Sequence, residues 1–178
     1  QKHDVIRRQR QMCIRDSYLE EKEIFLESTS SMVFDRVNRI VYAGISPRTN
    51  PVQLILWCRK NDYELILFET ESHIGSPIYH TDVLMYVGTN LIGICFDVIK
   101  PEHREYVKEN VHRFHEVLEL SSEQIEDFCG NAIEAKNNNG ELFIILSSRA
   151  YAALENDQKD ILLKHYKEII HSDISTIE

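Results

Sequence analysis

Two short stretches place side chains that could carry a proton or bind a cation within an apolar, β-branched background. Residues 77–83 contain His80 and Asp82, and residues 25–33 contain Glu27. Such a background predicts strands. On an extended strand His80 and Asp82, two positions apart, project from the same face and could address one ligand together. The spacing therefore predicts a site for proton transfer or cation binding that faces a wet cleft or a partner.

Each of these residues also has an ordinary interpretation. A single histidine beside a strand is more often a surface or core side chain bonded to a carbonyl than a catalyst. One glutamate is less informative still. The site hypothesis therefore depends on several such positions occurring together.

Composition limits the classes of partner. The 178 residues are 43% hydrophobic and 28% charged, as is typical of one soluble globular domain, and the formal net charge is -9. An acidic chain is a poor candidate for binding nucleic acid or an anionic membrane. No apolar run approaches the roughly 18 residues of a membrane span, and the first residues do not resemble a signal peptide. We therefore expect a cytoplasmic protein.

The four cysteines are widely spaced. Cys13, Cys58, Cys95 and Cys129 form no C-x-x-C motif and no regular interval, as a zinc site or a disulfide framework would require. Cys58 and Cys95 lie in apolar runs and are expected to be small buried hydrophobes. We predict no metal and no cofactor.

The first 17 residues differ from the rest, because they are basic and carry no hydrophobic pattern. They are expected to be a disordered or non-native opening. Residues 11–17, QMCIRDS, resemble the translation of sequencing-adapter DNA at the edge of a contig. The predicted domain therefore covers residues 18–178, and no function is assigned to Cys13.

Behind the candidate residues, the chain repeats one order of elements. Predicted strands at 24–26, 32–34 and 39–43 lead through a loop bracketed by Pro47 and Pro51 to a helix at 52–60 and a strand at 64–68. Strands at 79–87 and 91–98, separated by a turn at 88–90, then precede a helix from 101 to 110 and a strand at 117–120.

A third round is partial. A helix begins at Ser121, strands 132–135 and 142–146 pair across an Asn-rich turn, helices cover 150–154 and 156–170, and a last strand begins at 174–177. A β-β-α-β unit that recurs about every 50 residues indicates radial or solenoid repetition, because each unit can bury its apolar face only against its neighbours.

Five motifs in this order make the chain similar to the guanidino-group-modifying superfamily of arginine deiminase, dimethylarginine hydrolase and amidinotransferase. They lie at residues 25–36, 46–49, 77–83, 128–131 and 147–151, and the similarity runs from about Tyr18 to Glu178. The citrulline-hydrolase, arginine-deiminase-related branch is the most similar. The resemblance implies an α/β fold, an incomplete five-fold pseudosymmetric propeller of β-β-α-β units.

The resemblance also implies a role for each candidate residue. His80 matches the general acid/base, Glu27 the carboxylate that orients it and Asp82 the aspartate that binds the guanidinium nitrogens. Arg48 matches the arginine that grips the substrate α-carboxylate. The chemistry requires these types: a thiolate attacks the poorly electrophilic carbon while an imidazole protonates the departing amine and later activates water. Planar cations suit bidentate carboxylates.

Three departures from the family pattern are present. Ser28 and Ser30 replace the glycines usual after the glutamate, and Asp82 stands where the citrulline-cleaving branch often has asparagine. The family's nucleophilic cysteine follows a glycine-rich turn near the C-terminus, and none of the four cysteines matches it. The resemblance therefore implies a fragment truncated at both ends, without an upstream module that carries a second substrate-binding carboxylate and with the nucleophile beyond Glu178. The chain as given is predicted to be inactive.

Three functions compete. The first is a fragment of a hydrolase that acts on the C–N bonds of a small amino-acid substrate, citrulline in the first place and an arginine-like guanidino compound in the second. The second is a noncatalytic binding member of the same fold, and the third is an unrelated α/β domain. The Glu27, His80 and Asp82 set favours the first, because a scaffold does not need it. An oligomer is compatible with all three.

Overall fold

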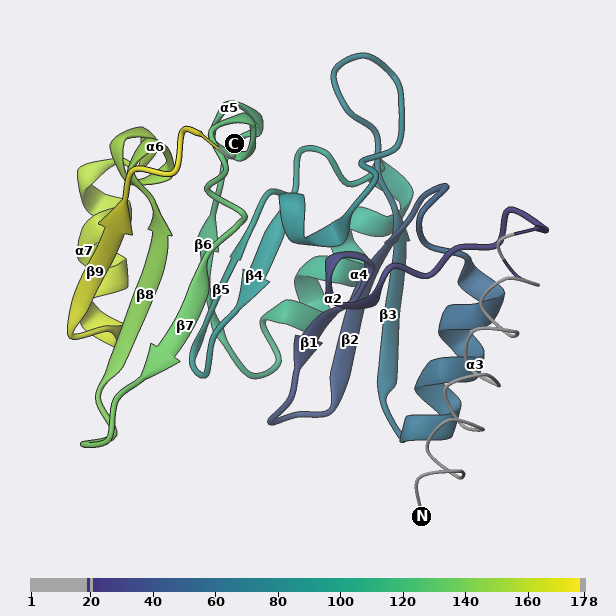
Figure 1. Ribbon diagram of the computed structural model, residues 1–178, viewed down its shortest axis with the longest axis horizontal. Coiled ribbons are helices and arrows are strands. Elements are labelled where there is room, and N and C mark those ends of the chain that lie inside the picture. Colours follow the sequence, from purple (N-terminus) through teal and green to yellow (C-terminus); the bar gives the residue numbers. More distant parts are fainter. Residues whose placement is uncertain (1–18, 20, 177–178) are drawn as a thin grey trace, which may run out of the picture.

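The computed structural model describes residue 19 and residues 21–176 of the chain. Three separate three-stranded sheets stand side by side, and helices lie between and behind them (Figure 1). None of the described helices is long and apolar enough to span a membrane. The opening at residues 1–17, for which a disordered or non-native structure is predicted, lies outside the described residues.

The first unit contains β1, β2, α3 and β3, at Val33–Asp35, Ile40–Ile45, Pro51–Asn61 and Glu64–Glu69. β1 and β2 are antiparallel, whereas β2 and β3 are parallel and are joined by the crossover helix α3. The start of α3 is encoded locally, because the Asn50 side chain accepts hydrogen bonds from the amides of Val52 and Gln53. Asp62 ends the helix with a positive φ of 58°.

The second unit repeats this topology with β4, β5, α4 and β6, at Met85–Val87, Leu91–Ile94, Pro101–Val111 and Glu116–Glu119. The third contains β7, β8, α6, α7 and β9, at Ile133–Lys136, Leu142–Ser147, Ser148–Ala153, Asn156–His165 and Glu168–Ser172. A short helix α5, Ser122–Glu126, begins with a capping box between Ser121 and Gln124. The β-β-α-β repeat read from the sequence is confirmed.

The units stack so that the first and second sheets each lie between a helix of their own unit and a helix of the next unit. On one face of the first sheet, Val41 and Ala43 pack with Leu54 and Cys58 of α3. The opposite face joins the main core, where Ile66 lies in one cluster with Val107 of α4. In the same way α7 of the third unit reaches the second sheet, because the Gln158 side chain donates to the Glu119 carbonyl. The first strands β1, β4 and β7 are neighbours at the centre, as in an incomplete propeller.

Five predicted elements are wrong. The predicted strand at 24–26 is reduced to an isolated bridge at Leu26. Residues 28–31, inside the stretch 25–33 that was expected to be extended, form the helical turn α2 (Ser28–Ser31), and residues 81–83, inside the predicted strand 79–87, form the 3-10 turn η1 (Thr81–Val83). The physical reason is that hydroxyl side chains there bond to backbone groups and favour turns over a sheet ladder. His80 and Asp82 therefore do not share a strand face.

The other two errors lie at the C-terminal end. The predicted helix 156–170 ends at His165, where the buried Tyr166 takes up extended geometry, and residues 168–172 pair with β8 as strand β9. Residues 174–176 are not a strand. The third unit is thus already completed by β9. Lys164 and His165 in the last helical turn were the available signal for the end of the helix, together with the β-branched pair Ile169 and Ile170 farther along.

Candidate active site

Glu27, His80 and Arg48 come together at the junction of the first and second units. The Glu27 Oε2 atom lies 2.6 Å from His80 Nε2, and Glu27 Oε1 accepts a hydrogen bond of 2.5 Å from Arg48 Nη1. The side chains of His80 and Glu27 are 22% and 31% exposed, and that of Arg48 is 56% exposed. One carboxylate thus binds an imidazole and a guanidinium with separate oxygens, in a partly solvated setting.

These contacts determine the charge on Glu27. The Arg48 guanidinium first, and the His80 ring second, hold the pKa of the Glu27 carboxyl below its ordinary value. Glu27 is therefore ionised near neutral pH. An ionised partner 2.6 Å from Nε2 fixes the orientation of the imidazole.

Asp82 lies on η1, two residues after His80, and faces a cleft. Burial raises the pKa of its carboxyl, while His80 and the Ser30 hydroxyl act in the opposite direction. The Asp82 backbone carbonyl accepts a 3.0 Å hydrogen bond from Asn131 Nδ2 of the third unit. A half-buried carboxylate of this kind favours a cationic ligand, which compensates for the water that it has lost.

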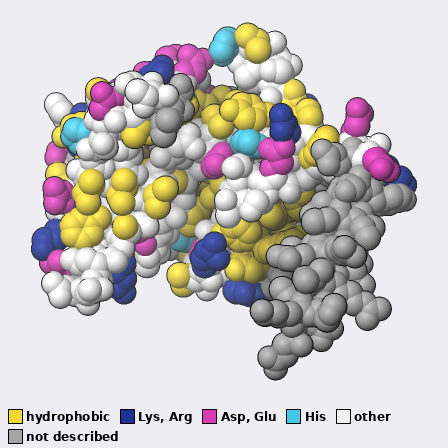
Figure 2. Space-filling view, viewed as in Figure 1, with side chains coloured by type: hydrophobic (Ala, Val, Ile, Leu, Met, Phe, Trp, Pro, Cys, Tyr) yellow, Lys and Arg dark blue, Asp and Glu magenta, His cyan; other side chains and the backbone are white. Residues whose placement is uncertain are grey.

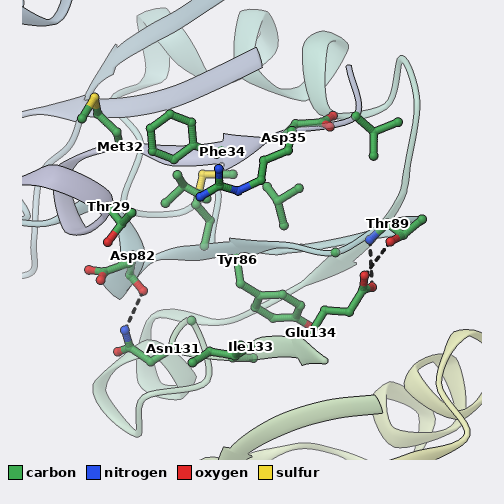
Figure 3. A pocket seen from close by; sticks show the side chains of 18 residues that line it. Thr29, Met32, Phe34, Asp35, Asp82, Tyr86, Thr89, Asn131, Ile133 and Glu134 are labelled. Carbon is green, nitrogen blue, oxygen red and sulfur yellow. Dashed lines mark hydrogen bonds between the residues drawn. The ribbon is translucent and has the colours of Figure 1, made fainter. Parts of the chain in front are cut away.

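The cleft has a volume of about 530 Å³ and runs along the first strands of the three units. Thr29, Asp82 and Asn131 lie at one end, Thr89 and Glu134 at the other, and the Tyr86 ring between them (Figure 3). Glu27, His80 and Arg48 are not part of its lining. Asp82 is thus the candidate residue that links the Glu27–His80 pair to the cleft.

A glycine brings the third unit against this end of the cleft. A Cβ atom on Gly130 would meet the Val83 carbonyl oxygen at 2.1 Å, so a side chain there would push the 128–131 loop away from η1. The sequence marked this loop as a family motif without giving it a role. In the structure, Gly130 and Asn131 of this loop line the cleft together with Asp82.

Cys58, Cys95 and Cys129 are free and buried. Burial raises the pKa of each thiol, to about 12 for Cys129. The Cys129 Sγ atom donates to the Ala150 carbonyl at 3.4 Å. Since a thiolate is the reactive form, none of these three is prepared for nucleophilic attack. Among the described residues, no three His, Cys, Asp or Glu side chains are grouped so as to hold a metal ion.

The sequence did not single out the hydroxyl residues Ser31, Ser46 and Thr81, which bond around this site. The sequence did hold a signal for these hydroxyl residues, because each lies within four positions of a candidate residue. Ser31 follows Glu27 by four positions, Ser46 precedes Arg48 by two, and Thr81 follows His80 directly. The position of a hydroxyl beside a charged residue does not reveal the backbone group to which it will bond.

The stacked β-β-α-β units, with a carboxylate and a histidine at the junction of two of them, are those of an incomplete α/β propeller. The sequence profile of eukaryotic N,N-dimethylarginine dimethylhydrolase matches residues 3–178. The chain belongs to that family, and its placement in the wider superfamily is confirmed. The citrulline-hydrolase branch stays a prediction. A search of curated proteins gave no match.

Solved structures show the same fold. The N-terminal domain of ArgZ, an arginine dihydrolase from Cyanobacteria, aligns with a TM-score of 0.63 at 14% identity over 87% of this chain and 56% of its own. AgrE, in a complex with L-arginine, gives 0.64 at 12% identity over 82% and 20%. DDAH from Pseudomonas aeruginosa, complexed with citrulline, gives 0.52 at 17% over 84% and 52%. This chain thus spans about half of the ArgZ domain.

Proposed function

We propose that this chain carries the acid–base and cation-binding groups of a hydrolase that cleaves a C–N bond of an arginine-like substrate through a covalent thiol intermediate. The contact of 2.6 Å between Glu27 Oε2 and His80 Nε2, two residues from Asp82, carries the proposal. Protonated His80 gives its proton to the departing amine and then, as a base, takes one from the water that releases the covalent intermediate. Glu27 keeps the ring in place through both steps.

Asp82 supports a guanidino substrate over a ureido one. A carboxylate paired with a cationic guanidinium gains a charge-assisted contact worth about 1.5–3 kcal/mol, which a neutral ureido group supplies less well. The name of the family, dimethylarginine dimethylhydrolase, points in the same direction. We therefore place arginine or an N-methylated arginine ahead of citrulline, the reverse of the order expected from the resemblance to the citrulline-hydrolase branch.

Arg48 remains a proposed ligand of the substrate α-carboxylate. Its Nη1 atom is bonded to Glu27, while more than half of the side chain is exposed. In this role the Arg48 guanidinium would bind the substrate α-carboxylate and the Glu27 carboxylate at the same time, and Glu27 in turn binds His80. Arg48→Ala should then weaken the binding of amino acids more than that of guanidines that lack a carboxylate, and equal weakening of both would remove the role.

We propose further that the reacting thiol is none of Cys58, Cys95 and Cys129, because all three are buried with a raised pKa. The chain should therefore release no ammonia, alkylamine or ornithine from arginine, dimethylarginine or citrulline. A haloacetamidine should label these three cysteines slowly. Rapid labelling that substrate prevents, mapped by mass spectrometry, would show instead that one of them is the nucleophile.

Binding is the test of the site itself. In a titration followed by NMR, L-arginine should shift the ring signals of His80, and Asp82→Asn should abolish this shift. Asp97→Asn is the matched control, because Asp97 is an exposed aspartate outside the cleft lining. Binding that survives Asp82→Asn would remove the proposed role of Asp82. Binding in a complete protein without turnover would favour the noncatalytic alternative.

A further inference from the structure

Three segments distant in the sequence carry the site. Residues 27–31 bear Glu27, residues 44–49 bear Arg48, and residues 79–82 bear His80 and Asp82. Sheet pairing does not hold them together, since Leu26 and Thr49 form only an isolated bridge. Glu27 and His80 are nevertheless brought within hydrogen-bond distance although they lie 53 positions apart. One backbone hydrogen bond, from the Glu27 amide to the Arg48 carbonyl, joins the first two segments. The third segment must be held by side chains.

Ser31 joins the first segment to the second. It is completely buried, and its hydroxyl donates to the Arg48 carbonyl at 2.9 Å and accepts from the Glu27 amide at 3.3 Å. The same hydroxyl therefore contacts the backbone of both members of the Glu27–Arg48 ion pair. The desolvation of a buried hydroxyl is offset when it is satisfied both as donor and as acceptor.

Ser46 and Thr81 complete the connection. The Ser46 hydroxyl, in the second segment, donates to the Tyr79 carbonyl of the third at 2.7 Å. The Thr81 hydroxyl donates to the Ser31 carbonyl of the first segment at 2.8 Å and accepts from the Gly44 amide of the second at 2.9 Å. Thr81 is 1% exposed, so water does not compete for these bonds.

We propose that Ser31, Ser46 and Thr81 form a cyclic hydroxyl clamp that positions His80 against Glu27. Donation runs from the first segment to the second, from the second to the third and from the third back to the first. Removal of one hydroxyl opens the cycle and deletes one or two of the hydrogen bonds that cross between the segments. The importance of the clamp for catalysis rests on the proposed function, whereas its effect on geometry does not.

Thr81 is the principal positioning residue of the clamp. It stands between His80 and Asp82 in the chain, and its hydroxyl contacts both of the other segments. A rotation of the backbone at Thr81 would move the His80 ring and the Asp82 carboxylate together. Its β-branched side chain restricts χ1 and so helps to keep the hydroxyl in place.

The test compares Thr81→Val with Thr81→Ser in the 178-residue chain. Valine keeps the shape and removes the hydroxyl, whereas serine keeps the hydroxyl. NMR follows the pKa of the Glu27 carboxyl and the ring N–H proton of His80 that is bonded to Glu27. We expect Thr81→Val to raise the pKa of Glu27 toward its ordinary value and to abolish the signal of the bonded proton. Thr81→Ser should keep both near the values of the original chain.

Two further variants keep the test decisive. Ser46→Ala breaks a different bond of the cycle at a less buried position and should change both readouts in the same direction, so it carries the test if Thr81→Val does not fold. Ile66→Val lowers stability in the core away from the site and should change neither. Unchanged readouts in Thr81→Val, or equal changes in Ile66→Val, would overturn the clamp. No readout depends on turnover, so failure to bind arginine refutes the proposed function separately.

Discussion

The first and third sheets each carry a row of apolar side chains across their three strands. The row of the first sheet is buried by a helix of the next unit, whereas the row of the third sheet is exposed. In the first sheet a row across the three strands, Val33, Tyr42 and Ile66, is 9%, 0% and 0% exposed. The corresponding row of the third sheet, Ile133, Ile145 and Ile170, is 67%, 38% and 40% exposed. Apolar side chains gather over the third sheet, at the left of Figure 2. The first row lies in one core cluster with α4 residues.

One charged position repeats with this pattern. Glu64, Glu116 and Glu168 each begin the third strand of a unit, and they are spaced 52 residues apart. Arg113, after α4, pairs with Glu64, and His165, at the end of α7, pairs with Glu116. Among the described residues, Glu168 has no such partner. Whether the apolar row of a sheet is buried thus depends on the helix of the following unit and not on the hydrophobic pattern of the sheet's own strands.

The largest difference is expected on truncation of the two rows. Ile66→Ala should lower the free energy of unfolding by about 2–5 kcal/mol, because it leaves a cavity under α4. Ile170→Ala should cost roughly 0.5–1.5 kcal/mol, since much of that side chain is already in water. Urea unfolding followed by circular dichroism measures both. Equal losses would show that the open face of the third sheet is covered in solution.

A pH dependence should arise at the covered boundary. His115, buried between the first two units, has its Nε2 atom 3.5 Å from Asp35 Oδ2. Desolvation lowers its pKa, whereas Asp35, the Gly88 backbone and Glu134 oppose this effect. The unfolded chain therefore binds the proton more readily, and stability should fall as the pH drops below the ordinary value of about 6.5.

The contribution of His115 is at most about 1.4 kcal/mol per pH unit. Unfolding measured at a series of pH values from 7.5 to 5 should give a shallower loss for His115→Gln than for the original chain. Lys167, which occupies the same place before Glu168, is exposed, and Lys167→Gln should leave the slope unchanged. An unchanged slope in His115→Gln would place the titrating group elsewhere.

The smallest effect is expected at the repeated glutamate. The Glu64 Oε1 to Arg113 Nη1 contact is 2.7 Å, between side chains that are 46% and 42% exposed, so it should contribute only about 0.2–1 kcal/mol. A double-mutant cycle with Glu64→Gln and Arg113→Gln measures the coupling. Glu168→Gln should be neutral, and a loss as large as that of Glu64→Gln would reveal a partner for Glu168.

The repeat was predictable because its signals are local. Pro51 and Pro101 begin helices, Ser121 begins the capping box of α5, and residues 88–90 turn between paired strands. These preferences act within a few residues. The exposure of Ile133 could not be predicted in this way, because it depends on what packs against the sheet from elsewhere in the chain.

The resemblance predicted which candidate residues to examine together and not how they contact one another. The resemblance selected Glu27, His80 and Arg48, and the structure brings these three together. The strand expected around His80 and Asp82 was wrong, since hydroxyl bonds to distant backbone groups decide that conformation. The engagement of Arg48 with Glu27 was also not expected, because nothing in the spacing links positions 27 and 48. The roles of these residues stay predictions.

The placement of Glu27 before β1 and of His80 before β4 has a consequence for partial unfolding. The described strands pair only within their own units, apart from an isolated bridge between Thr70 and Ile99, whereas the Glu27–His80 contact crosses from one unit to the next. Separation of two units as cooperative bodies would break this contact and leave each sheet's hydrogen bonds intact. Amides within the sheets should then resist hydrogen exchange under conditions where the segments of the site already exchange.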